Sequence, residues 1–158
     1  MSGILEAGQK APAFSLLNQD GEQLSLKDFK GDKIIVLYFY PKAMTPGCTT
    51  QACGIRDAKR RMSSAGVVVL GVSPDQPEKL EKFRVKEKLN FDLLSDPDHA
   101  VAEAYGVWAL KKNYGKEYMG IVRSTFIIGT EGKILHVMPK VNTKTHHDDV
   151  LDWIKAHT

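Results

Sequence analysis

Apolar residues in this chain gather into a few short, nearly continuous runs, separated by longer stretches of mixed polarity. The run 33–40 is rich in β-branched and aromatic residues and ends at Pro41, which predicts a buried, parallel strand. Residues 67–72 form a second apolar run and predict another buried strand. A helix over 45–64 is predicted between them, so this part of the chain indicates a strand–helix–strand unit.

The rest of the chain continues the alternation of strands and helices. In chain order we expect an N-terminal hairpin of 14–16 and 23–26 across the turn signal 18–21, a helix from 73–77 to about residue 89, a strand over 91–94, a helix over 98–105, a hairpin of 125–129 and 133–138, and a terminal helix over 148–157. This order predicts an α/β sandwich with a central mixed sheet, formed as one domain by residues 1–158.

Composition narrows the class of protein. A charged fraction of 26% and an apolar fraction of 42% are ordinary for a soluble globular domain. The net charge of +3 is small, and Lys and Arg are scattered, which disfavours a nucleic-acid partner. No apolar run approaches the ~18 residues of a membrane-spanning helix, and residues 1–10 lack a signal-peptide core. We therefore expect a cytoplasmic protein without a membrane partner, in a compartment where catalytic disulfides are more common than structural ones.

The chemistry of the chain is concentrated around its two cysteines, Cys48 and Cys53. Thr45 is a good N-cap, and Pro46 suits the first helical position, which makes Cys48 the third residue of the predicted helix. Its sulfur then lies among unpaired backbone N–H groups at the positive end of the helix dipole. Both features favour the thiolate, which is the nucleophilic form of cysteine.

Cys53 follows five residues later. In an intact helix, five residues correspond to a rotation of about 140° and Cα atoms roughly 8–9 Å apart, beyond the ~7 Å that a disulfide spans. Two threonines follow Cys48, and the glycines at 47 and 54 flank the segment, so its helix propensity is low. We interpret the segment as a helix that opens: Cys48 reacts while it is folded, and Cys53 captures Cys48 after it unfolds.

Other interpretations of the cysteines have less support. Two buried structural thiols remain an alternative, although the capping signature and the paired placement favour reactivity. A zinc site is disfavoured because two cysteines five residues apart lack the usual ligand spacing, and the adjacent His146 and His147 point about 100° apart on a helix. The spacing also differs from the Cys-x-x-Cys of disulfide reductases.

At these residues the chain resembles a known family. The pattern Pro41-x-x-x-Thr45-x-x-Cys48 resembles the peroxidatic motif of the peroxiredoxins, and the longer run from Tyr40 to Cys53 is similar to their Q-type subgroup, also called bacterioferritin comigratory protein. Further stretches occur in the family's order: Pro12-x-Phe14-x-Leu16, Gly71-Val-Ser73, Leu94-Ser-Asp96, Tyr105-Gly-Val-Trp108 and Arg123-Ser-Thr-Phe126.

The resemblance implies a fold and a set of roles. The fold would be a thioredoxin-like three-layer sandwich with a central mixed β-sheet and an N-terminal β-hairpin extension. Cys48 would be the peroxidatic cysteine and Cys53 the resolving one. Thr45 would hydrogen-bond the peroxide, Pro41 would shield the sulfur from water, and Arg123 would polarise thiolate and peroxide. No histidine receives a catalytic role, because the helix and the arginine take the place of a base.

The implied activity is thiol-dependent reduction of hydrogen peroxide and organic hydroperoxides. An intramolecular Cys48–Cys53 disulfide would be recycled by thioredoxin or a glutaredoxin-like dithiol, with no metal or organic cofactor, in a monomeric enzyme. Two other functions remain open: a peroxide-sensing switch or binding protein with the same fold, and a thioredoxin-like module with unreactive thiols.

Overall fold

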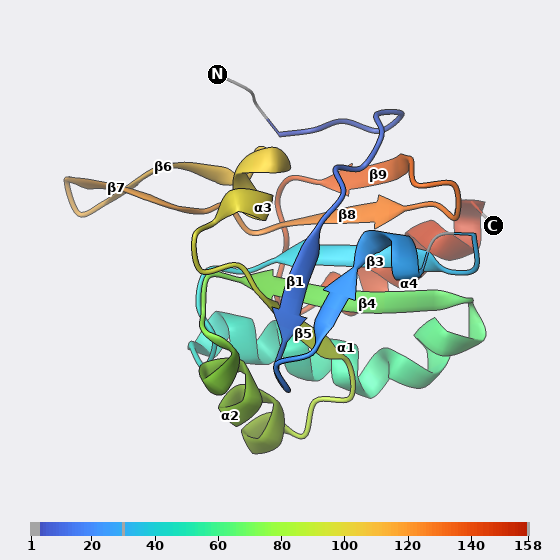
Figure 1. Cartoon of the computed structure of the whole chain (residues 1–158), viewed down its shortest axis with the longest axis horizontal. Helices are drawn as coiled ribbons and strands as arrows, with labels where there is room; N and C mark the ends of the chain where they lie inside the picture. The colour runs from blue at the N-terminus through green and yellow to red at the C-terminus, as the bar shows by residue number, and fades with distance from the viewer. Residues whose placement is uncertain (1–3, 30, 158) are drawn as a thin grey trace.

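The computed structural model describes residues 4–29 and 31–157 (Figure 1). The expectation that residues 1–10 lack a signal-peptide core falls partly outside this range, because residues 1–3 are not among the described residues. The elements, in chain order, are β1 (Ser15–Asn18), β2 (Gln23–Ser25), a 3₁₀ turn (Leu26–Asp28), β3 (Ile34–Phe39), α1 (Pro46–Ser64), β4 (Val67–Ser73), α2 (Pro77–Glu87), β5 (Asp92–Ser95), α3 (Ala100–Ala104), β6 (Trp108–Asn113), β7 (Lys116–Ile121), β8 (Ser124–Ile128), β9 (Ile134–Met138) and α4 (His146–His157).

Seven strands form one mixed sheet in the order β2-β1-β5-β4-β3-β8-β9. The central strands β3, β4 and β5 are parallel, and β8 pairs antiparallel with β3. The predicted N-terminal hairpin is confirmed, and it forms an edge of this sheet because β1 also pairs with β5. The buried runs predicted from the sequence are thus the centre of the sheet.

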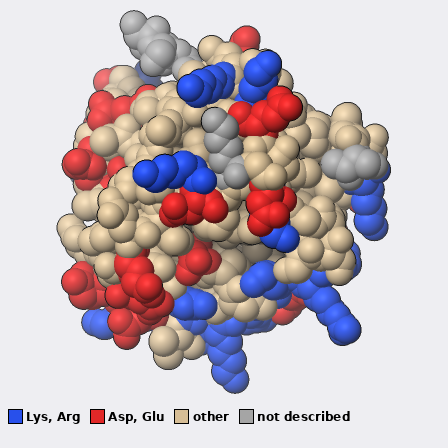
Figure 2. Space-filling view, turned by 45° about the vertical axis from the view of Figure 1, so that its right-hand side comes forward, with Lys and Arg blue, Asp and Glu red and all other residues tan. Residues whose placement is uncertain are grey.

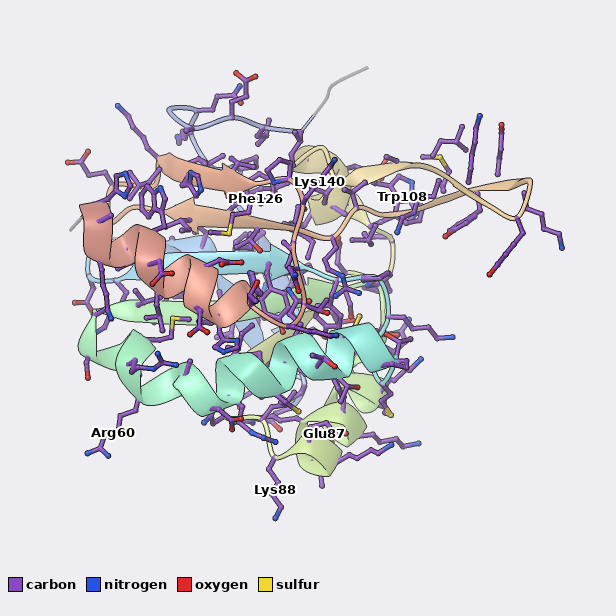
Figure 3. The ribbon with its side chains drawn as sticks, turned by 180° about the vertical axis from the view of Figure 1, so that it is seen from behind. Arg60, Glu87, Lys88, Trp108, Phe126 and Lys140 are labelled. Carbon is purple, nitrogen blue, oxygen red and sulfur yellow. The ribbon has the colours of Figure 1, made fainter. Side chains whose placement is uncertain are left out.

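Helices and a connecting segment cover the two faces of the sheet, which confirms the three-layer sandwich. One core packs α1, α2 and α4 on the sheet, and α1 and α4 lie against each other (Figures 1 and 3). The opposite core contains α3 and the apolar side chains Ala11, Phe14 and Leu26 near the N-terminus. In the strands alternate side chains enter opposite cores, as with Val36 and Leu37.

The β6–β7 hairpin was not predicted from the sequence. It forms a separate two-stranded sheet that projects from the body beside α3 (Figure 1). Its two-residue turn consists of Tyr114 and Gly115, both with positive φ, as a twisted hairpin requires. Tyrosine is unusual at such a position, where Asn or Asp is the usual signal, so the turn is weakly marked. The hairpin ends two residues before Arg123.

Candidate active site

A six-residue loop, residues 40–45, leads from β3 to the helix that carries both cysteines. Asp75, which lies between β4 and α2, fixes this loop: its Oδ2 accepts hydrogen bonds from the backbone N–H of Ala43 (2.7 Å) and from Oγ of Ser73 (2.8 Å). Met44 has a φ of 68°, a left-handed conformation that few non-glycine residues adopt. The Asp75 carboxylate therefore helps hold a strained turn directly before the helix.

Thr45 is the N-cap residue of α1, and Pro46 is its first residue, as predicted. The backbone oxygen of Thr45 accepts from the N–H of Thr49 (2.9 Å). Its hydroxyl, however, donates to the carbonyl of Lys42 (2.8 Å) and makes no capping bond to the helix. Because the single hydroxyl proton is donated to the Lys42 carbonyl, the lone pairs of Oγ1 can accept a hydrogen bond from a bound ligand. Competition between the capping and ligand-binding roles of this hydroxyl therefore does not arise.

Cys48 lies in the first turn of α1 and is 2% exposed. Its Sγ accepts a hydrogen bond from Nη2 of Arg123, at 3.2 Å. Arg123 directly precedes β8, whose Ser124 pairs with Phe39 at the end of β3, so the sheet brings the arginine to the start of α1. The guanidinium also lies against Gly47, where an added Cβ would be 3.4 Å from Nη2.

Gln51 is a site residue that sequence reasoning missed. It is fully buried, one helical turn after Cys48, and its Oε1 accepts from Nη1 of Arg123 (2.5 Å). The available signal was its spacing: residues i and i+3 of a helix share a face, so Gln51 had to lie on the side of Cys48. The Arg123 guanidinium thus bridges two residues of α1.

Pro41 lies two residues after the end of β3 and is half-buried near the start of the loop. Pro41, Thr45 and Cys48 lie along one continuous segment, and Arg123 reaches Cys48 from the residue just before the neighbouring strand β8. Shielding of the sulfur by Pro41 stays a prediction, and so does peroxide binding by Thr45.

Cys53 lies further along the same intact helix, and both cysteines are free. Helix geometry separates their Cα atoms by roughly 8–9 Å, too far for a disulfide. Sγ of Cys53 donates a hydrogen bond to Oε1 of Glu87 at 3.6 Å. Glu87 is the last residue of α2 (Figure 3). Burial and the Glu87 carboxylate raise the pKa of Cys53, and the nearby Arg56 only partly opposes them. Cys53 is therefore held as a thiol.

Gly54 has a packing role besides its low helix propensity. A Cβ at this position would lie 2.4 Å from Nδ1 of His147, so the missing side chain lets the His147 ring of α4 rest on α1. The segment that carries both cysteines consequently packs closely against the C-terminal helix at Gly54.

Three of the described histidines, His99, His136 and His157, stack on tryptophans. His99 lies on Trp108 with ring centroids 3.8 Å apart, and His136 lies on Trp153 at 4.9 Å. Within residues 4–29 and 31–157, no group of three His, Cys, Asp or Glu side chains is placed to hold a metal ion. The described residues thus offer no such ligand set for the alternative zinc site.

A buried thiol in the first turn of a helix, contacted by a guanidinium at the edge of a thioredoxin-like sheet, defines a thiol-based redox protein. Residues 7–137 match the AhpC/TSA family. The chain is 58% identical over 153 residues to peroxiredoxin Bcp of Escherichia coli (strain K12), covering 97% of each chain. It therefore belongs to the AhpC/TSA family, as a peroxiredoxin of the Bcp or Q type.

Solved structures agree with this family and with the fold. Peroxiredoxin Q of Xanthomonas campestris, 37% identical, matches with a TM-score of 0.89 over 97% of this chain and 99% of that chain. The bacterioferritin comigratory protein of the same organism, whose structure was described for its alkyl peroxide reduction activity, matches with a TM-score of 0.89 at 36% identity over 96% of this chain and 99% of that chain.

Proposed function

We propose that this protein is a thiol peroxidase that reduces hydrogen peroxide and alkyl hydroperoxides through Cys48. The observation that carries the proposal is the contact between Nη2 of Arg123 and Sγ of Cys48, at 3.2 Å in the first turn of α1. Membership of the Bcp peroxiredoxins and the alkyl peroxide activity of the Xanthomonas campestris relative support the substrate class.

In the first step, the Cys48 thiolate attacks one oxygen of the peroxide. An S–O bond forms, the O–O bond breaks, and the second oxygen leaves as alkoxide or hydroxide, which takes a proton to become alcohol or water. The sulfur is oxidised to a sulfenic acid. Positive potential is needed at both the sulfur and the leaving oxygen, and the helix N-terminus and Arg123 supply it without moving a proton.

Thr45 and Pro41 act on the peroxide and its surroundings in this proposal. With its proton donated to Lys42, the hydroxyl of Thr45 accepts a hydrogen bond from the peroxide O–H. Pro41, half-buried at the start of the loop, limits the access of water to the sulfur.

In the second step, Cys53 condenses with the sulfenic acid. The Cys53 sulfur bonds to the Cys48 sulfur, and the hydroxyl leaves with the thiol proton as water. Because the intact helix separates the two residues, α1 must unfold locally between Cys48 and Cys53. The two weak helix formers and two glycines of this segment make that opening less costly.

In the third step, an external dithiol reduces the disulfide by thiol–disulfide exchange and becomes a disulfide itself. We propose thioredoxin or a glutaredoxin-like protein as this partner. The first step exchanges an O–O bond for an S–O bond, the second exchanges that S–O bond for an S–S bond, and the third passes the S–S bond to the partner, so we propose no metal or organic cofactor for any of them.

We also propose that residues 1–158 act as one domain and as a cytoplasmic monomer without a nucleic-acid or membrane partner. Acidic and basic side chains are mixed on the face shown in Figure 2, which supports the absence of a nucleic-acid partner. None of the helices in residues 4–29 and 31–157 is long and apolar enough to cross a membrane. Size-exclusion chromatography with light scattering measures the oligomeric state.

Stopped-flow tryptophan fluorescence of the reduced protein mixed with hydrogen peroxide, followed by mass spectrometry, tests the proposal. The expected product is two hydrogens lighter and contains one Cys48–Cys53 bridge. Repeated turnover with excess peroxide and a dithiol distinguishes an enzyme from a redox sensor, which would stop after one equivalent. Oxidation at the rate of a free thiol would contradict the proposal and favour the unreactive module.

A further inference from the structure

Behind the Arg123 guanidinium, a row of buried polar side chains leads from the site into α4. Nη1 of Arg123 donates to Oε1 of Gln51 (2.5 Å), and Nε2 of Gln51 lies 3.1 Å from Nδ1 of His146. Nε2 of His146 lies 2.7 Å from Oγ1 of Thr125 on β8. Gln51 and Thr125 are fully buried, and His146 is 1% exposed. The first residue of α4 is therefore connected to the arginine through one glutamine.

The donors and acceptors of this row have only one consistent arrangement. A guanidinium can only donate, so the atom of Gln51 that faces Arg123 is its oxygen. The amide nitrogen then faces His146 and donates, and Nδ1 must accept. The imidazole proton consequently sits on Nε2 and is donated to Thr125. The orientation of the glutamine and the tautomer of the histidine fix each other.

His146 is surrounded so that its neutral form is favoured. Burial lowers the pKa of His146 to about 4, and the electrostatic influence of His147 and of the Arg123 guanidinium acts in the same direction. From β3, the ring of Tyr38 lies 5.6 Å from the imidazole. The ionisable groups that face His146 are therefore Arg123, His147 and Tyr38, and the neutral ring keeps its Nδ1 free to accept.

We propose that His146 is a positioning residue for the peroxidase reaction: its Nδ1 holds the Gln51 amide in the one orientation that keeps Arg123 directed at Cys48. This inference rests on the proposed function and assigns to a residue of α4 a part in it. Without an acceptor at position 146, the Gln51 amide is free to rotate and present its NH₂ to the guanidinium. Two donors would then face each other, and Arg123 would lose the contact that directs it.

Three substitutions separate positioning from packing. His146→Phe keeps the ring but removes both nitrogens. His146→Asn places an oxygen near the position of Nδ1 and restores the acceptor for Gln51, whereas His146→Gln reaches toward the position of Nε2 and does not. His136→Phe, on β9, is the matched control. The readouts are the rate of Cys48 oxidation in a single turnover, the rate of disulfide formation that follows, and the melting temperature.

We expect His146→Phe to slow oxidation of Cys48 about tenfold or more, within the range for a displaced catalytic group. His146→Asn should recover most of the rate and His146→Gln should not, while disulfide formation stays near its original rate. In the Arg123→Met background, His146→Phe should cause no further loss, because the histidine acts through the arginine.

Gln51→Glu gives an independent readout of the same contact. A carboxylate beside the imidazole favours the charged ring, so the pKa of His146, followed by NMR, should rise from about 4. The new oxygen still accepts from Arg123, so oxidation of Cys48 should remain faster than in Gln51→Met.

The inference would be overturned if His146→Asn and His146→Gln slowed the oxidation of Cys48 equally. It would also be overturned if His146→Phe slowed this oxidation further in the Arg123→Met background. If the Phe variant does not fold, the Asn and Gln pair carries the comparison by itself. Failure of the proposed function would look different, because Cys48 of the unsubstituted protein would then be oxidised only at the rate of a free thiol, whatever residue stands at position 146.

Discussion

Nη2 of Arg123 lies 3.2 Å from Sγ of Cys48, although the two residues are 75 positions apart in the chain. The contact exists because β8, which begins one residue after Arg123, pairs with β3, and β3 leads through a short loop into the first turn of α1. The guanidinium thereby places two donors on α1, one at the thiol and one at Gln51.

Arg123→Met should slow the oxidation of Cys48 by about 10²-fold or more, which is the scale for losing one preorganised donor to developing charge. Arg123→Lys should give an intermediate rate, because an ammonium keeps the charge but cannot reproduce the planar fork that reaches both Cys48 and Gln51. Stopped-flow fluorescence of the reduced variants measures the rate. Arg60→Met, at an exposed position of α1 that points away from the body (Figure 3), is the control. An unchanged rate for Arg123→Met would remove Arg123 from the site.

The two cysteine variants should fail at different steps. Cys48→Ser should abolish peroxide consumption. Cys53→Ser should still consume one equivalent of peroxide and then stop, because the sulfenic acid has no partner to condense with unless an external thiol supplies one. Peroxide assays with and without a dithiol, together with mass spectrometry of the sulfenic acid, separate the two results. Full activity in Cys48→Ser would contradict the assigned nucleophile.

The contact between Gly54 and His147 predicts that Gly54→Ala changes the stability of the protein in opposite directions with and without the His147 side chain. Gly54→Ala alone should destabilise the protein, because the new Cβ would lie 2.4 Å from the His147 ring, and the gain of about 1 kcal/mol in helix propensity cannot offset that overlap. In a His147→Ala background the overlap is removed, so the same substitution should stabilise α1. The melting temperatures of the unsubstituted protein, the two single variants and the double variant measure both effects.

A more stable α1 should also slow formation of the disulfide between Cys48 and Cys53. If α1 must open before Cys53 reaches Cys48, Gly54→Ala combined with His147→Ala should slow disulfide formation relative to His147→Ala alone, with oxidation of Cys48 unchanged. Equal rates of disulfide formation would show that opening of this segment does not limit the step.

Local patterns in the sequence predicted most of the fold, because they are strong where the core is formed. The apolar run around Val36 and the cap at Thr45 and Pro46 gave β3 and the start of α1 within a residue. The β6–β7 hairpin was missed because its turn lacks the usual residues. The terminal helix begins at His146, two residues earlier than predicted, since His146 and His147 contact α1 and β8.

The site was predictable only in part, because some of its residues are close in sequence and others meet only through tertiary packing. Cys48, Cys53 and Thr45 are close in sequence, so helix geometry alone placed them. Arg123 could be assigned only through the family resemblance, because its approach depends on strand pairing. His146 joins Gln51 through tertiary packing, and no local pattern marks such a contact.

The contact between Cys53 and Glu87 predicts a charge-dependent reactivity of the second thiol. Burial, followed by the carboxylate, raises the pKa of Cys53, so little thiolate is present below the ordinary thiol pKa of about 8.5. Glu87→Gln removes the negative charge, which should lower the pKa of Cys53 and increase the thiolate fraction at any pH below the ordinary thiol pKa. In a Cys48→Ser background, where Cys53 is the only thiol, alkylation by iodoacetamide should therefore be several-fold faster.

Burial, the larger cause, persists in this variant, so the pKa of Cys53 should fall only part of the way to its ordinary value. Glu81→Gln, at an exposed carboxylate of the same helix, is the control and should leave the alkylation rate unchanged. The dependence of the rate on pH decides the cause: a shift of the whole titration curve to lower pH indicates the lost charge. A higher rate at every pH without that shift would indicate that the substitution merely exposes Cys53, and the electrostatic role of Glu87 would then be wrong.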